Sequence, residues 1–424
     1  MRVALISEHA SPLATLGGAD AGGQNVHVAA LAAALARRGH DVEVYTRRDD
    51  PSPPDVVGVR EGDRVVHVPA GPAETLPKDE LLPHMAEFGR WLGAQWLGGP
   101  PDVVHSHFWM SGVAALRAGA GAVPSAAAIE TASLPGPVPL VSTFHALGTV
   151  KRRMQGAADT SPAEREELEP LVAHAANQVI AQCSDEVREL LRLGVTRDHI
   201  SVVPSGVDLD LFSPGPSGPR LRDPRQPARI LSVGRLVVRK GFLDLIKALR
   251  LIPGAELVIA GGPPEAELGS DPLAVHLMRC AADLGLGDRV RLLGGVPQDR
   301  MPELYRSADL VACTPAYEPF GLTPLESMAC GTPVVAYAVG GLTDSITHNV
   351  SGVLVAPGDV DGLAKAIREL LTLEPRRYAL AVAGMSQAQA RYPWPRIAEQ
   401  MEAVYRSVIT RPLISSTCNV LVED

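Results

Sequence analysis

The stretch LVACTPAYEPFGLTPLESMACGTPVVAY, Leu310 to Tyr337, carries the pattern that decides the fold. Two apolar runs rich in β-branched residues, Leu310 to Cys313 and Pro333 to Tyr337, predict strands. Between them, Phe320 to Leu322 open a segment that we expect to be a helix carrying Glu326. A strand, a helix and a second strand in this order predict a parallel pair joined by a crossover helix.

The same alternation of short apolar runs and longer helical stretches extends along most of the chain. Gln24 to Arg38 is predicted as a helix, and Gly39 stands where a C-terminal helix cap is expected. In the first half the expected strands are Arg2 to Ser7, Asp41 to Thr46, Val103 to Ser106, Leu140 to Thr143, Gln178 to Gln182 and Ile200 to Val203. In the second half they are Arg229 to Val233, Glu256 to Ala260, Val290 to Leu293, Leu310 to Cys313, Pro333 to Tyr337 and Gly352 to Val355. We therefore predict an α/β protein with two Rossmann-like, doubly wound parallel-sheet domains.

The boundary between these domains is marked by a change in composition. From Ser213 to Pro227, in SPGPSGPRLRDPRQP, proline, glycine and charge replace periodicity, which is typical of a linker. We predict an N-terminal domain over residues 1–212, a linker over 213–227 and a C-terminal domain over 228–394. Residues 395–424 are predicted as a last helix that packs back on the N-terminal domain, followed by a tail. Two such domains place a cleft between the carboxyl ends of their sheets, where ligands of open parallel sheets bind.

Composition and charge exclude several classes of partner. The longest apolar run, Val26 to Leu35, is too short to cross a bilayer core of about 30 Å. The formal net charge of −9 disfavours nucleic acid and anionic lipid as partners. Met1 to Ser7 lack the features of a secretory signal and resemble an opening strand. We expect a cytoplasmic protein without a membrane span, and the sequence is compatible with a homodimer.

A glycine-rich loop, GGADAGGQN, follows the first predicted strand and contains Gly22 and Gly23. Such a loop lets backbone N–H groups at a helix N-terminus approach a phosphate, although it can also be an ordinary turn. A dinucleotide site would need Gly-x-Gly-x-x-Gly and an acidic residue ending the second strand. The spacing here differs and the second strand runs into Arg47 and Arg48, so hydride transfer is disfavoured.

The stretch SVGRLVVRKG places Arg235 and Lys240 just past a predicted strand of the second domain. Two cations on a loop facing the cleft can hold a diphosphate and stabilise the charge that develops when it leaves. The alternative is a solvent-exposed basic loop that precedes the helix expected from Phe242 to Leu251.

The opening stretch adds two carboxylates to this site. Glu318 is expected just before a helix N-terminus and Glu326 about one turn inside the helix, with the amides of Phe320, Gly321 and Leu322 exposed between them. Carboxylates suit the hydroxyl groups of a sugar and a ribose, while the amides suit phosphate or sugar oxygens. The sequence holds no dense aspartate or histidine cluster suited to a metal, so a site without metal or cofactor is expected.

Taken together, these motifs resemble the family 4 glycosyltransferases of the two-domain GT-B type. The likeness rests on GGADAGGQNVHVAALAAALARRGHDVEVYTR, DVVHSHFWMSG, VSTFHALGTVKR, ISVVPSGVDLDLFSP, VGRLVVRKG, EPFGLTPLESMACGTPVVAYAVGG and GVLVAPGD. Within the family, the nearest likeness is to the actinobacterial enzymes of mycothiol biosynthesis that join N-acetylglucosamine to inositol phosphate. Sucrose-phosphate synthases share some of these strings.

The resemblance implies a role for each matching residue on the donor side. Arg235 and Lys240 match the family's diphosphate-binding pair, Glu326 its ribose-binding glutamate and Glu318 the glutamate that contacts the donor sugar. Gly23, with Gly22 beside it, matches the glycine loop next to the β-phosphate, and His145 matches the active-site histidine near the donor sugar. Without the family, His145 could equally be a structural histidine that closes a strand. We take His145, Arg235, Lys240 and Glu318 as the catalytic set, in a retaining, metal-independent reaction by front-face attack.

On the acceptor side the likeness is less complete. In the mycothiol enzymes a lysine, a tyrosine, a threonine and an arginine hold the acceptor phosphate. Lys78 and Thr143 match here, whereas Phe108 stands for the tyrosine and Gln155 stands near the arginine position. The predicted acceptor set is Asn25, Lys78, Phe108, Thr143 and Gln155, and the basic run Lys151 to Arg153 lies close to it in sequence. Loss of a phenol and a guanidinium is expected to weaken phosphate recognition.

We therefore predict a retaining glycosyltransferase that moves a hexosyl group from a UDP- or GDP-sugar to a small polar acceptor such as a cyclitol or cyclitol phosphate. One alternative is a tailoring enzyme of specialised metabolism that acts on an aminocyclitol or a small thiol. Alternatives of other classes are a nucleotide-sugar epimerase of similar fold and a non-catalytic binder of nucleotide sugars. An epimerase would need acid and base groups on both faces of the sugar, and beyond His145 the sequence suggests no such pair.

Overall fold

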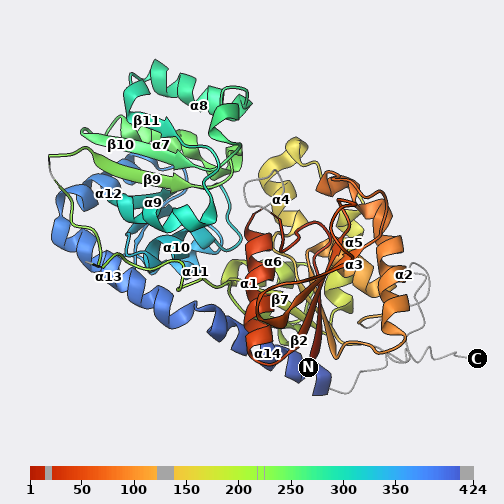
Figure 1. The fold of residues 1–424 in the computed structure, drawn as a ribbon. Helices are drawn as coiled ribbons and strands as arrows, with labels where there is room; N and C mark the ends of the chain where they lie inside the picture. The colour runs from red at the N-terminus through yellow and green to blue at the C-terminus, as the bar shows by residue number, and fades with distance from the viewer. Residues whose placement is uncertain (15–21, 122–137, 217, 224, 411–424) are drawn as a thin grey trace, which may run out of the picture.

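The chain forms two α/β lobes in the computed structural model, which describes all residues except 15–21, 122–137, 217, 224 and 411–424 (Figure 1). The first lobe holds an eight-stranded sheet in the order β3-β4-β2-β1-β5-β6-β7-β8. Its strands are β1 Arg2–Ile6, β2 Asp41–Arg47, β3 Val56–Gly58, β4 Arg64–Val68, β5 Val103–His107, β6 Leu140–Thr143, β7 Gln178–Ala181 and β8 Ile200–Val202. All of its pairings are parallel except that of β3 with β4.

The second lobe holds a six-stranded, wholly parallel sheet in the order β11-β10-β9-β12-β13-β14. Its strands are β9 Ala228–Val233, β10 Ala255–Ala260, β11 Val290–Leu292, β12 Leu310–Cys313, β13 Val334–Tyr337 and β14 Val353–Val355. In both sheets the chain winds outward in one direction and then returns to the other side of its first strand, β1 or β9. The sequence-based fold class is therefore confirmed.

Helices cover both faces of each sheet (Figure 1). In the first lobe they are α1 Gly23–Arg37, α2 Met85–Trp96, α3 Trp109–Arg117, α4 Gly148–Gln155, α5 Arg165–Ala175 and α6 Ser184–Arg192. In the second they are α7 Phe242–Leu249, α8 Pro272–Asp283, α9 Met301–Ser307, α10 Leu322–Ala329, α11 Leu342–Ser345, α12 Val360–Thr372 and α13 Glu374–Arg391, and the chain continues into α14 Trp394–Thr410.

The predicted strands lie within one or two residues of the observed ones, and Gly39 follows α1 with the φ of 84° that suits a glycine after a helix. The sequence analysis missed β3 and β4. Arg64–Val68 is a short run between charged and glycine-rich turns, and β3 returns antiparallel to it as a short edge strand, so neither follows the strand and helix alternation. Gly17 and Gly18 of the glycine-rich loop, and the predicted tail from 411 onward, lie outside the described residues.

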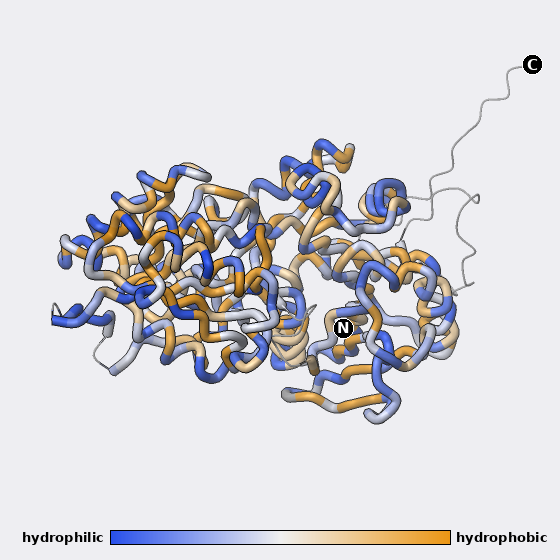
Figure 2. Tube along the Cα trace, turned by 90° about the horizontal axis from the view of Figure 1, so that it is seen from above, coloured by the Kyte–Doolittle hydropathy of each residue, from blue (hydrophilic) through white to orange (hydrophobic). Residues whose placement is uncertain are grey.

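Alternate residues of each strand enter different cores, because successive side chains of a strand point to opposite faces. Ala4 and Ile6 of β1 pack with α2 and α3, whereas Val3 and Leu5 pack with α1 and α14. Both faces of the sheet are therefore buried, which explains the continuous apolar runs in its strands. Figure 2 shows the hydrophobic segments gathered inside each lobe and hydrophilic segments toward the outside.

The chain passes between the lobes twice, at two neighbouring places. On the way out, Val207 and Phe212 already pack in a core cluster of the second lobe, and the described part of 213–227 holds only an isolated bridge between Gly215 and Gly218. On the way back, α13 ends and α14 begins, and α14 lies along α1 on the first lobe (Figure 1). The amide of Val207 donates to the carbonyl oxygen of Tyr392 at 2.8 Å, which ties the two crossings together.

Across the described helices, none combines the length and apolar character needed to span a membrane.

Replacing Met401 by alanine tests the packing of α14 on the first lobe. Met401 is fully buried in the cluster that joins α14 to α1 and β1, so the change should lower the free energy of unfolding by about 2–5 kcal/mol. Urea unfolding of this variant should be compared with that of Glu399→Ala, an exposed position on the same helix that should change stability by less than about 0.5 kcal/mol. Equal losses in both variants would contradict this packing role.

Candidate active site

A cleft of about 380 Å³ lies between the lobes, at the carboxyl ends of the strands. From the first lobe it is lined by the start of α1 and the residues after β6, and from the second by the loops after β9, β10 and β12 and the start of α10. The described residues that line it include every predicted donor-side residue: Gly22, Gly23, His145, Arg235, Lys240, Glu318, Phe320, Gly321, Leu322 and Glu326. The topology explains this convergence, because β9 and β12 flank the point where the second sheet reverses direction.

Positive charge enters the cleft from the loop after β9. Arg235 and Lys240 line the cleft together with Arg239, a third cation that the sequence analysis did not single out. The ammonium of Lys240 lies 2.5 Å from Oε2 of Glu318, and the guanidinium of Arg239 lies 3.8 Å from the same oxygen. Arg239 also donates to the carbonyl oxygen of Tyr317 at 3.3 Å. Arg239 directly precedes Lys240 in the run VRKG, so the sequence could have suggested it as a further cation of this loop.

Glu318 is the acidic counterpart of these cations. Burial alone would raise its pKa, but Lys240, Arg239 and Arg235 together hold the pKa of this carboxyl below its usual value. The carboxylate is therefore charged at neutral pH. It can accept hydrogen bonds from sugar hydroxyls, and its charge balances part of the positive loop.

Glu326 lies one turn inside α10 and behaves differently. Burial raises its pKa, and a hydrogen bond of 2.6 Å from the hydroxyl of Tyr305 offsets part of that rise. The helix begins at Leu322, and its capping residue Gly321 has a φ of 90° and offers no side chain. The helix N-terminus therefore opens directly into the cleft, where its N–H groups can meet an anion.

The first lobe faces this helix with its glycine loop. A Cβ atom on Gly23 would lie 3.5 Å from Cδ1 of Leu322, and one on Gly22 would lie 4.0 Å from Nε of Arg235. Asn25 is buried behind the loop, where its side-chain oxygen accepts from the amide of Gly22 at 2.9 Å. The loop thus brings backbone close to the cations of the other lobe.

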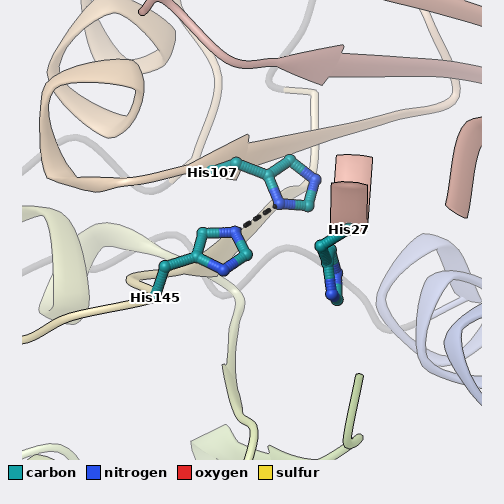
Figure 3. A group of neighbouring side chains, drawn as sticks. All are labelled: His27, His107 and His145. Carbon is teal, nitrogen blue, oxygen red and sulfur yellow. Dashed lines mark hydrogen bonds between the residues drawn. The ribbon is translucent and has the colours of Figure 1, made fainter. Parts of the chain in front are cut away.

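Three histidines from separate segments lie at the first-lobe side of the cleft: His27 on α1, His107 at the end of β5 and His145 after β6. Figure 3 shows their rings turned toward one another, and Nδ1 of His107 lies 3.0 Å from Nε2 of His145. Burial lowers the pKa of His27 to about 4 and lowers the pKa values of His107 and His145 well below the usual value, so all three rings are neutral at pH 7.

The sequence shows no dense histidine cluster, but the fold brings three histidines together in space. In the described part of the chain, His27, His107 and His145 are the one group of three whose ligand atoms lie within 4.8 Å of one another. The sequence could not reveal the group, because its members are far apart along the chain and meet only through the pairing of β5 with β6 and the packing of α1.

The described residues that line this cleft do not include the predicted acceptor residues Asn25, Lys78, Phe108, Thr143 and Gln155. Thr143 ends β6, and its hydroxyl lies 2.8 Å from Nε2 of the buried His105. Lys78 lies in a short 3₁₀ turn, and Gln155 ends α4.

A buried arginine, Arg165, lies next to Phe108. The sequence had suggested Gln155, with the basic run Lys151 to Arg153 close by, for the arginine position of the acceptor site. The guanidinium of Arg165 lies 5.0 Å from the centre of the Phe108 ring. It is already engaged, because it donates to Glu169 and to the carbonyl oxygen of Ala146. Arg165 was not predicted from the sequence, because it lies well beyond Gln155 along the chain.

Comparison with known proteins agrees with this geometry. A family model described as "Glycosyltransferase Family 4" matches residues 21–211, and one described as "Glycosyl transferases group 1" matches residues 219–386. D-inositol 3-phosphate glycosyltransferase of Xylanimonas cellulosilytica is 39% identical, with 97% of both chains covered. D-inositol 3-phosphate glycosyltransferase of Mycolicibacterium smegmatis is 38% identical, with 95% of this chain and 90% of the relative covered.

Among solved structures, sucrose-phosphate synthase from Thermosynechococcus elongatus superposes with a TM-score of 0.83 at 31% identity, over 96% of this chain and 98% of that one. HepE of Anabaena, in complex with UDP-glucose, superposes with a TM-score of 0.69 at 20% identity, over 96% of this chain and all of the other. Two doubly wound domains around a shared cleft, together with both family models, define a GT-B glycosyltransferase. The chain belongs to glycosyltransferase family 4, as its motifs had indicated.

The loop after β9 that carries Arg235, Arg239 and Lys240 is called the cationic loop below. Replacing Gly241 by alanine tests how tightly this loop is held. Gly241 has a φ of +69°, and a Cβ atom there would overlap the backbone oxygen of Thr314. Gly254 is a matched control, with a φ of +70° and no heavy atom within 4 Å of the added carbon. By calorimetry, Gly254→Ala should cost only about 1–2 kcal/mol of backbone strain, and Gly241→Ala should cost more. Equal shifts in melting temperature would contradict this close contact.

Proposed function

We propose that this protein is a retaining glycosyltransferase that moves a hexosyl group from a UDP- or GDP-sugar to a small polar acceptor, such as a cyclitol or cyclitol phosphate. The observation that carries the proposal is the cleft in which Arg235, Arg239 and Lys240 face Glu318 beside the open N-terminus of α10. This arrangement offers positive charge and backbone donors to a diphosphate and a carboxylate to sugar hydroxyls.

In the proposed donor complex, Arg235 and Lys240 hold the diphosphate, and Glu326 binds the ribose. Glu318 and His145 lie beside the sugar. Lys240 must then share its hydrogen bonds between Glu318 and a phosphate oxygen, which its three N–H donors allow. The relative HepE was solved with UDP-glucose, and this supports a nucleotide-sugar donor for a cleft built on the same fold.

The proposed reaction follows from these contacts. The bond between the anomeric carbon and the phosphate oxygen breaks, and the acceptor oxygen attacks from the same face of the sugar. Configuration is retained because the new bond forms on the face from which the diphosphate leaves. The leaving phosphate oxygen takes the proton of the acceptor hydroxyl, so the new glycosidic oxygen carries no charge. Arg235 and Lys240 stabilise the charge that develops on the diphosphate, which is the role a bound metal plays in other transferases. We propose that no metal or cofactor takes part.

The acceptor is proposed from the relatives together with the first-lobe residues. Two relatives at 38% and 39% identity are named D-inositol 3-phosphate glycosyltransferases, which favours a cyclitol. Phe108 offers no hydroxyl to a phosphate, and the guanidinium of the neighbouring Arg165 is bonded to Glu169. We therefore expect a weaker preference for the phosphorylated form than a site with a tyrosine would give.

Lys240→Ala should lower turnover by about 10²- to 10³-fold, because it removes one of the preorganised positive charges that stabilise the leaving diphosphate. The measurement is the rate of nucleoside diphosphate release with saturating donor and acceptor. Lys247→Ala is the matched control. Lys247 lies on α7, its ammonium is 3.8 Å from a carboxylate oxygen of Asp244, and it is not among the described residues that line the cleft. Turnover of Lys240→Ala close to that of the control would contradict the proposed role of Lys240 in stabilising the leaving diphosphate.

The function itself is tested by incubating the protein with a panel of UDP- and GDP-sugars and following slow donor hydrolysis by mass spectrometry. Hydrolysis of one donor identifies it before the acceptor is known. Hydrolysis of no donor, even with cyclitols added, would contradict a nucleotide-sugar transferase.

With the donor identified, inositol and inositol phosphate should be used with kcat/KM values within about tenfold of each other. Phe108→Tyr should raise the preference for the phosphate by about tenfold or more, because one hydrogen bond to a charged group contributes about 1.5–3 kcal/mol. A preference for the phosphate above about a hundredfold in the unaltered protein would contradict this view of Phe108.

A further inference from the structure

His107 is a buried residue at the floor of the active site that the proposed function leaves unused. It ends β5 and is fully buried, whereas its partner His145 lines the cleft. Nδ1 of His107 lies 3.0 Å from Nε2 of His145, and the two rings are stacked with an interplanar angle of 24° (Figure 3). Nε2 of His107 has no hydrogen-bond partner among the described residues.

Both rings are neutral, so one of them donates and the other accepts. Burial lowers both pKa values, and the neighbouring histidines lower them further: His105 and His27 act on both rings and His9 acts on His145. A neutral imidazole carries one proton, on Nδ1 or on Nε2. The direction of the bond between His107 and His145 therefore decides which nitrogen of His145 carries its proton.

Contacts on the other side of His145 favour one direction of the hydrogen bond between His107 and His145. Nδ1 of His27 lies 2.9 Å from the hydroxyl of Ser205 and 3.3 Å from the side-chain nitrogen of Gln182. An amide nitrogen only donates, so Nδ1 of His27 accepts from Gln182, and the amide oxygen of Gln182 can accept from another ring. A side-chain hydrogen bond of Gln182 also raises the pKa of His145. Because Nε2 of His145 faces His107, a proton that His145 gives to this oxygen comes from Nδ1.

The backbone of His145 gives an independent reason for such support. Its φ is 59°, in the left-handed region that residues other than glycine seldom adopt. Strained residues of this kind persist only where their surroundings hold them, and they gather at functional sites. Hydrogen bonds of the ring with His107 and with Gln182 supply that support.

We propose that His107 is a positioning residue: it donates from Nδ1 to Nε2 of His145 and fixes His145 in the tautomer that offers its Nδ1 proton to the cleft. Gln182 and His145 both line the cleft, so an oxygen of the donor sugar can replace the amide oxygen of Gln182 as the acceptor of this proton. The catalytic part of this inference rests on the proposed function, whereas the tautomer does not.

The tautomer is measured on the protein without substrate, from the ¹⁵N chemical shifts of labelled histidines. The Nδ1–H form of His145 is expected in the unaltered protein and in His107→Asn, whose amide nitrogen can take the place of Nδ1. His107→Leu has similar bulk but no N–H to disfavour a proton on Nε2 of His145, so the population of the Nε2–H form should rise above that of the unaltered protein. An Nε2–H form in the unaltered protein, or an unchanged tautomer in His107→Leu, would overturn the proposal.

Kinetics test the consequence, with the nucleotide sugar that the donor panel identifies. His107→Leu should lower kcat by about 10- to 100-fold with little change in KM, and His107→Asn should stay within about threefold. His67→Leu removes another buried histidine, which bonds the carbonyl oxygen of Pro54 far from the cleft lining, and it should leave kcat unchanged. Equal losses of kcat in His107→Asn and His107→Leu would contradict a donor role.

Zinc binding is the competing use of these histidines. Their ligand atoms lie within 4.8 Å of one another, and a metal would take the lone pairs that the hydrogen bonds use. Titration with ZnCl₂ in a calorimeter should show no binding that depends on His107. One tightly bound ion per chain, lost in His107→Leu and kept in His67→Leu, would overturn the tautomer assignment.

Discussion

Parallel strand pairing is the constraint on which the rest of this structure depends. In a parallel sheet all strands end at the same edge, and a reversal of winding leaves a crevice at that edge where two neighbouring loops diverge. The second sheet reverses at β9, so the loop carrying Arg235 and Lys240 and the loop carrying Glu318 leave adjacent strands. The first sheet reverses at β1, and the glycine loop leaves from that strand.

Charge balance inside the cleft follows from that convergence. Glu318 and Glu326 are eight positions apart and both half-buried, yet their pKa values move in opposite directions. Glu318 faces three cations and stays charged, whereas Glu326 accepts a hydrogen bond from the hydroxyl of Tyr305. A charged carboxylate that holds Lys240 at 2.5 Å keeps the cation in place, which would lower the reorganisation needed to bind the proposed donor.

Sequence was a good guide wherever one local signal determined the outcome. β-branched apolar runs located every strand that follows the strand and helix alternation. Arg235, Lys240, Glu318 and Glu326 were expected to face the cleft because they follow the ends of such runs, and they line it. The short edge strands β3 and β4 were missed because their pairing depends on each other and on little local pattern.

Contacts between distant segments could not be predicted in this way. His27, His107 and His145 come from three separate segments, and Arg165 reaches Phe108 from another helix. The surroundings of the proposed acceptor residues are built mainly from such contacts, whereas the proposed donor residues of the second lobe lie on the loops after β9 and β12. This is why the sequence could predict which of these loop residues line the cleft and could not predict what surrounds Phe108.

The paired crossings between the lobes restrict how the cleft can open. Val207 and Tyr392 are bonded where the chain leaves and returns, and Trp394 fills the space beside Gly206, where a Cβ atom would lie 2.6 Å from its ring. Two connections fixed side by side would confine any relative movement of the lobes to a rotation about this place. Because α14 packs along α1 of the first lobe, such a rotation would change the distance between the cationic loop and Gly22 and Gly23.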